Sequence, residues 1–187
     1  STPATQDFTK IMLEDSLGVL TKEAERKGKY PFYGEEDVRR LKNYWETKEY
    51  HEKFDIEDFE IEFKDAGHIL GSAIIEIKSK KTGKKIVFTG DLGNPPTPLL
   101  NPTEDIYDAN FLVIDSTYGG KNHEERSQRK LKLERVIEEA ATKKGTLLMP
   151  AFSLERTQEI LFELNDLIEK NKVPRISVFV DSPLAIK

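Results

Sequence analysis

The sequence predicts an α/β protein, and three observations support this fold class. In the central third, apolar and charged side chains alternate with the period of a half-buried strand, as at Phe59, Ile61 and Phe63. In the last third, helical patterns alternate with short apolar runs, which is typical of a parallel sheet. The 187 residues are 37% hydrophobic and 34% charged, enough for a folded core under a well-solvated surface.

Two helices are predicted before residue 55. The first begins directly after the opening segment 1–5, and Phe8, Ile11 and Met12 share one of its faces. The second starts with three acidic residues at 35–37, which suit the positive end of a helix dipole. The apolar face of this second helix consists of Val38, Leu41, Tyr44 and Trp45.

Strands are predicted at 59–63, 72–78 and 85–88, and a Lys-Lys-Thr-Gly turn joins the last two. The segment 90–96 is rich in glycine and proline and interrupts all regular structure. The run 111–114 is continuously apolar, as expected for a strand that is covered on both faces.

The last third is predicted to contain two helices and two buried strands. The first helix spans 124–144 and ends at Gly145, and Ser153 is predicted to cap the second. The strands are expected at 146–149 and 176–180. Residues expected to face inward are Leu133, Val136, Ile137 and Ala140 in the first helix and Leu154, Leu161, Leu164 and Ile168 in the second. The chain lacks an initiator methionine and stops just after a strand, so we expect both ends to be cut.

Composition excludes several kinds of chemistry. There are no cysteines, so any metal must be held by histidine and carboxylate. No apolar run is long enough to cross a bilayer, and a cytoplasmic location fits these features. The net charge is −5, whereas proteins that grip nucleic acid through a basic surface usually carry the opposite sign. Any grip on nucleic acid would therefore have to be local or supplied by metal.

Three polar side chains, His68, Asp91 and Asp115, directly follow strand-like segments. The ends of buried strands are where α/β proteins gather a site, and histidine and carboxylate are suitable zinc ligands. Flanking glycines allow sharp turns and a close backbone approach, at 67, 71, 90, 93, 119 and 120. The sequence therefore predicts a His/Asp metal site.

Each of these residues also has a purely structural interpretation. Asp91 and Asp115 would brace their own turns by accepting hydrogen bonds from backbone N–H groups, and His68 would be an ordinary hydrogen-bonded histidine. His51 lies in a charged run and is expected at the surface, and His123 is expected in solvent at a helix start. Spacing alone leaves both interpretations open.

Six motif strings, taken in order along the chain, resemble the β-CASP branch of the metallo-β-lactamase superfamily. They are Thr2 to Thr5, DAGHILGSA at 65–73, FTGDLG at 88–93, IDSTYG at 114–119, PAFSLERTQE at 150–159 and DSPLA at 181–185. The DAGHILGSA string resembles the bacterial and archaeal relatives of the cleavage-and-polyadenylation endonuclease more than ribonuclease J. The resemblance implies a partial metallo-β-lactamase αββα sandwich over 1–120, followed by the beginning of a Rossmann-like β-CASP domain over 121–187.

The resemblance also implies a site and a reaction. His68 would bind one of two zinc ions, and Asp91 would bridge both and take part in catalysis. Asp115 would be a second catalytic carboxylate that orients a ligand or a proton carrier. His123 resembles a histidine that follows the same motif in relatives, and we do not expect it to be a ligand. The substrate of such nucleases is single-stranded RNA, bound in the cleft between the two domains.

The chain departs from the family pattern in its metal ligands. The family's His-x-His-x-Asp-His cluster and its two later histidine motifs, B and C, are absent, which leaves His68 and Asp91. Zinc prefers about four ligands, so this chain alone is expected to be inactive and the intact protein to be a zinc-dependent ribonuclease. The alternatives are a DNA-processing nuclease, a non-catalytic scaffold or binding subunit, and a non-nuclease hydrolase of the superfamily. An incomplete sandwich would expose strand edges, so we expect self-association or a complementing chain.

Overall fold

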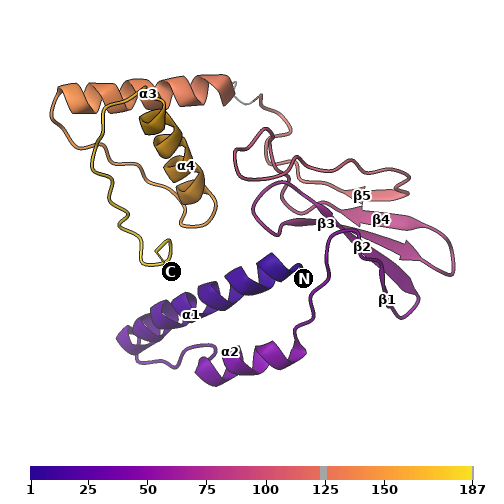
Figure 1. Cartoon of the computed structure of the whole chain (residues 1–187). Coiled ribbons are helices and arrows are strands. Elements are labelled where there is room, and N and C mark those ends of the chain that lie inside the picture. Colours follow the sequence, from indigo (N-terminus) through magenta and orange to yellow (C-terminus); the bar gives the residue numbers. More distant parts are fainter. Residues whose placement is uncertain (123–125, 187) are drawn as a thin grey trace. The chain divides into compact units, whose positions relative to one another are not determined.

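A computed structural model describes residues 1–122 and 126–186 (Figure 1). These residues form two compact units. The first comprises Ser1–Asn94 and Pro102–Asp115, and the second comprises Pro95–Asn101 and Ser116–Ile186. Within the described ranges, no helix combines the length and the apolar character needed to cross a bilayer.

The first unit begins with two helices, α1 (Pro3–Arg26) and α2 (Glu35–Leu41), and a 3-10 turn, η1 (Lys42–Tyr44). Thr2 is the N-cap of α1, because its Oγ1 accepts a hydrogen bond from Thr5 N at 3.3 Å. The first helix lies where the sequence predicts it, but α2 ends at Leu41, so Tyr44 and Trp45, predicted on its apolar face, lie in the 3-10 turn and directly after it. Their apolar faces are only partly covered within this unit, however, and three members are exposed: Met12, Leu41 and Tyr44.

The helices lead into a sheet of five strands in the order β1-β2-β3-β4-β5 (Figure 1). The strands are β1 (Phe54–Ile56), β2 (Phe59–Asp65), β3 (Ala73–Ser79), β4 (Lys85–Phe88) and β5 (Phe111–Val113). The first three pairs are antiparallel, and β5 joins parallel to β4. The four predicted strands of this region are confirmed, and β1 is an addition that its three-residue length made hard to detect.

The burial predicted for the run 111–114 is wrong. Phe111, Leu112, Val113 and Ile114 are 48% to 55% exposed. Among the described residues, β5 lies at the edge of the sheet and pairs with β4 alone, so its continuous apolarity is not accompanied by cover on both faces.

One face of the sheet is divided between an apolar end and a charged end. At the apolar end, Ala66, Ile74 and Val87 are buried, and Leu92 and Ile106 pack against them. The register places Glu62 of β2 opposite Glu76 of β3, and Glu76 opposite Val87 of β4, so charge begins where the apolar cluster stops. The apolar end lies under the loops that follow β2 and β4, which are the loops that carry His68 and Asp91.

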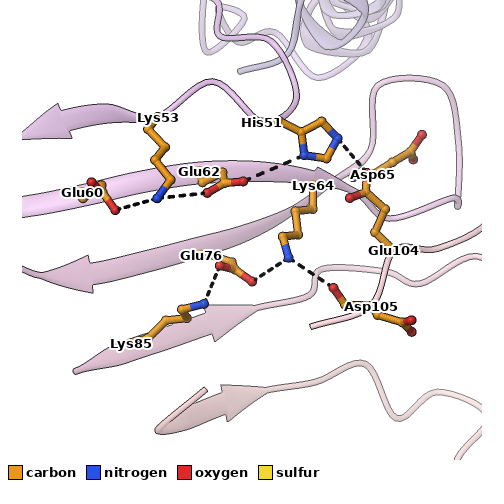
Figure 2. Close-up of polar contacts among 10 residues, drawn as sticks. All are labelled: His51, Lys53, Glu60, Glu62, Lys64, Asp65, Glu76, Lys85, Glu104 and Asp105. Carbon is orange, nitrogen blue, oxygen red and sulfur yellow. Dashed lines mark hydrogen bonds and ion pairs between the residues drawn. The ribbon is translucent and has the colours of Figure 1, made fainter. Parts of the chain in front are cut away.

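Glu76 is a buried charge at the centre of the charged end (Figure 2). Its Oε2 accepts a hydrogen bond from Lys85 Nζ at 2.8 Å, and Lys64 Nζ lies 3.3 Å from its Oε1. Burial raises the pKa of the Glu76 carboxyl, but the bonds from Lys85 and Lys64 outweigh burial and hold the pKa below its usual value. The two lysines also offset the repulsion between Glu76 and Glu62.

We expect Glu76→Gln to destabilise the protein at neutral pH by about 2 kcal/mol, the scale of hydrogen bonds to charged groups. Because the folded-state pKa is depressed, the stabilisation is fully present above the unfolded value near 4.5 and is lost as the pH falls through the folded value. The difference in the free energy of unfolding between wild type and Glu76→Gln should therefore shrink in acid. Urea unfolding at a series of pH values measures it, and a difference that does not change with pH would contradict the charge pairing.

The second unit is built on two helices, α3 (Arg126–Thr142) and α4 (Arg156–Glu169). Its core consists of Ile137, Leu164, Leu167 and Val173, with Leu133, Leu147, Ile160 and Ile168 packed against it. Gly145 N donates to Ala140 O at 2.9 Å and closes the end of α3, as predicted. The predicted cap of α4 is wrong: Glu155 is the N-cap, with a φ of 63°. Ser153 instead offers its backbone oxygen, which accepts a hydrogen bond from Gln158 Nε2 at 3.1 Å.

The two strands predicted in this unit, 146–149 and 176–180, are not formed. Leu148 is 83% exposed and Phe179 is 89% exposed, so neither segment is a buried strand. A strand requires a neighbour that accepts and donates backbone hydrogen bonds, and neither segment has such a neighbour among the described residues. An apolar composition was therefore not sufficient to make either segment a strand.

Candidate metal site

His68 lies on the loop between β2 and β3, and hydrogen bonds within this loop fix its shape. Asp65 Oδ1 accepts from Gly67 N at 2.8 Å, and Ser72 Oγ accepts from the backbone N of His68 at 3.1 Å and of Ile69 at 3.2 Å. Gly67 and Gly71 have φ values of 62° and 86°, a region that favours glycine. The His68 side chain is left 43% exposed at the tip of a closed loop.

The N-terminus of α1 holds the far end of this loop. Gly71 O accepts hydrogen bonds from Thr2 Oγ1 at 2.7 Å and from Thr5 Oγ1 at 3.0 Å. A Cβ on Gly71 would lie 2.8 Å from Thr5 N and 2.9 Å from Ala4 Cβ, so a side chain cannot fit there without a shift. The opening Thr-Pro-Ala-Thr segment therefore has a structural function, as a support of the His68 loop.

Asp91 lies on the loop that follows β4, and this loop packs directly on the His68 loop. Gly93 N donates to Ala66 O at 2.8 Å, and a Cβ on Gly93 would lie 1.8 Å from Gly67 O. This contact brings Asp91 Oδ2 to 3.9 Å from His68 Nε2. The structure thus brings together two residues that lie 23 positions apart and that the sequence assigned to one site.

Asp115 follows β5 and contacts the backbone of the Asp91 loop. Its Oδ2 accepts a hydrogen bond from Leu92 N at 3.2 Å, and its own N donates to Thr89 Oγ1 at 3.0 Å. Thr89 is 1% exposed, and its Oγ1 also donates to Gly90 O at 2.8 Å. This buried hydroxyl therefore connects the residue that follows β5 to the start of the Asp91 loop. Asp115 therefore braces the turn of Asp91.

The two remaining histidines are placed differently. His51 is 59% exposed, which confirms the surface location predicted for it, but it is paired with Glu104 and Glu62. His123 lies outside the described residues. No pattern in the sequence points to Glu104, because it lies in an irregular stretch between Pro102 and the start of β5.

His68 and Asp91 fit zinc by donor type and by spacing, but they do not complete a zinc site. Zinc–ligand bonds are about 2.0 to 2.2 Å long, so two donors of one ion lie within about 4.4 Å of each other. The 3.9 Å between Nε2 and Oδ2 satisfies this limit. In the part of the chain that the structure describes, no third His, Asp or Glu joins them in a metal-binding group. The pair therefore fits as two members of a larger ligand set.

Three curated proteins that are similar to this chain are named as ribonucleases. The chain is 31% identical to Ribonuclease TTHA0252 of Thermus thermophilus over 99% of its own length, and 38% identical to RNase aCSPSF2 of Saccharolobus solfataricus over 86%. It is 31% identical to Endoribonuclease YSH1 of Candida glabrata over 97%. The chain spans 40%, 31% and 23% of these three relatives. No protein-family model matches it.

The five-stranded sheet, with its two packed loops carrying His68 and Asp91, defines a mixed α/β protein with a partial metallo-β-lactamase-like fold. The relatives match along nearly the whole chain rather than at one motif. The homologues of this chain are β-CASP ribonucleases of the metallo-β-lactamase fold. The family predicted from the motif strings is confirmed.

Proposed function

We propose that the full-length protein containing this chain is a zinc-dependent phosphodiesterase that cleaves RNA. The observation that carries the proposal is the 3.9 Å approach of His68 Nε2 to Asp91 Oδ2 on two loops that are hydrogen-bonded to each other. The names of three relatives, each a ribonuclease, support RNA as the substrate. The proposal places the protein in the cytoplasm, in keeping with a chain that has no cysteine.

In this proposal, His68 and Asp91 hold zinc together with ligands beyond the described residues. Bound zinc would supply a positive charge for the phosphate and a water whose pKa is lowered to about 7. Asp115 keeps the Asp91 turn in place through Leu92 N, and Ser72 keeps His68 in place through two backbone N–H groups. The chain is acidic overall, so the attraction for the phosphate backbone is local to this site.

The test is cleavage by the full-length protein with and without metal. We expect single-stranded RNA to be cut, dialysis against a chelator to abolish cutting, and stoichiometric zinc to restore it, with zinc measured by mass spectrometry. A DNA strand of the same sequence, mixed in competition, separates ribonuclease from deoxyribonuclease activity. Full activity in metal-free protein would contradict the proposal, and so would preferential cleavage of the DNA strand.

A further inference from the structure

The base of the His68 loop is held by contacts that the family's motif strings do not include. β1 pairs with β2 only at Phe59 to Ile61, so the outer edge of β2 continues past the end of β1. The next backbone groups on this edge are those of Phe63 and Asp65. Phe63 O accepts a hydrogen bond from His51 N at 2.9 Å, and both backbone groups of Asp65 bond to Glu104.

Glu104 makes a two-point contact with Asp65. Its backbone N donates to Asp65 O at 3.0 Å, and its side-chain Oε1 accepts from Asp65 N at 3.0 Å. The residues on either side bind the same stretch: Thr103 Oγ1 donates to Ala66 O at 2.9 Å, and Lys64 Nζ donates to Asp105 O at 3.2 Å. We call residues 103–105 the strap, because they lie along Lys64 to Ala66 where a strand would otherwise pair.

The Glu104 carboxylate is itself oriented by His51. His51 Nε2 lies 3.3 Å from Glu104 Oε1, and its Nδ1 lies 3.9 Å from Glu62 Oε1 (Figure 2). The preceding residue, Tyr50, donates its hydroxyl to Ser72 O at 2.8 Å, at the other end of the loop. Burial, followed by the charges of Asp65 and Glu104, raises the pKa of Tyr50 to about 12, so this hydroxyl remains a donor at neutral pH. Residues 50 and 51 thus tie the two ends of the His68 loop to the strap.

We propose that Glu104 is a positioning residue for the metal site, which acts by holding the Asp65 backbone where the His68 loop begins. This inference rests on the proposed function, since it concerns how His68 is presented to zinc. The path is short: Glu104 Oε1 binds Asp65 N, Asp65 Oδ1 binds Gly67 N, and His68 follows. Without the carboxylate, Asp65 N loses its acceptor on the strap, while the bond from Glu104 N to Asp65 O remains, so the start of the loop is held less tightly.

The test uses two Glu104 variants of the full-length protein. Glu104→Ala removes the acceptor for Asp65 N, whereas Glu104→Gln keeps an oxygen in the same place. We expect Glu104→Ala to weaken zinc binding about tenfold, the lower end of the range for outer-shell partners, and Glu104→Gln to restore most of it. Hydrogen exchange should rise in residues 65–72 of Glu104→Ala, in metal-free protein as well.

The matched control is Glu60→Ala. Glu60 lies on β2 and its side chain is 36% exposed against 31% for Glu104, but within the described ranges its ion pair is with Lys53 alone, at 3.2 Å. The Glu60→Ala variant should leave zinc affinity and hydrogen exchange in residues 65–72 unchanged. Wild-type affinity in Glu104→Ala would overturn the inference, as would an equal loss in Glu60→Ala. If the wild type binds no zinc, the proposed function fails, and exchange in 65–72 still reports whether Glu104 holds the loop.

Discussion

Replacing His68 by Ala and Asp91 by Asn in the full-length protein should reduce RNA cleavage by more than about 100-fold, because loss of an outer-shell partner alone typically costs about 10- to 100-fold. The two side chains point at one position from two bonded loops, 3.9 Å apart, so each substitution removes a donor from the same site. Residues that act as a unit are not additive, and the double variant should be little worse than the more damaging single variant. Cleavage rates and bound zinc, measured on the same preparations, check both statements.

A suitable control for this pair is Asp55→Asn. Asp55 lies on β1, is 60% exposed and pairs with Lys80 at 2.7 Å, an exposed ion pair that contributes little to stability. Its activity and zinc content should match the wild type. If the double variant at His68 and Asp91 cleaved RNA at the wild-type rate, the site described above would not be the catalytic one.

Gly93→Ala should be among the most damaging substitutions of a single small residue in this chain. The added Cβ would lie 1.8 Å from Gly67 O and 2.9 Å from His68 N, both of them backbone atoms that cannot move without moving the loop. We expect a loss of stability of about 3 kcal/mol, at the upper end of the usual cost of overpacking. Because the clash is with the His68 loop itself, zinc affinity should fall with stability. Thermal unfolding and zinc titration measure the two effects.

Gly18→Ala provides the opposite case and serves as the control. Gly18 lies within α1, and a Cβ there would meet nothing within 4 Å. Alanine should therefore stabilise the protein by about 0.5 to 1 kcal/mol, the usual gain over glycine inside a helix. A Gly93→Ala variant as stable as Gly18→Ala would show that the two loops are not packed as described.

The sequence predicted the strands of the first unit well because local pattern and pairing agree there. β2 and β3 alternate along the chain and are joined through one closed loop, and β3 and β4 are joined by a tight turn, so their partners are close in sequence. The same reasoning failed at 146–149 and 176–180, because a parallel strand depends on a partner far along the chain. It also failed for the cover of 111–114, since an apolar run does not reveal whether its strand lies at an edge.

By itself, the sequence predicted the family and the helices and strands around the candidate site, and it proposed His68, Asp91 and Asp115 as the polar residues of that site. These depend on residue types at short spacing, which a motif string records. Only the tertiary structure decided that Asp115 braces the Asp91 turn, that Gly93 packs on Gly67, and that Glu104 holds Asp65. Each of these contacts joins residues 23 to 39 positions apart through a backbone group, and backbone groups are the same in every residue, so no side-chain pattern reports which ones meet.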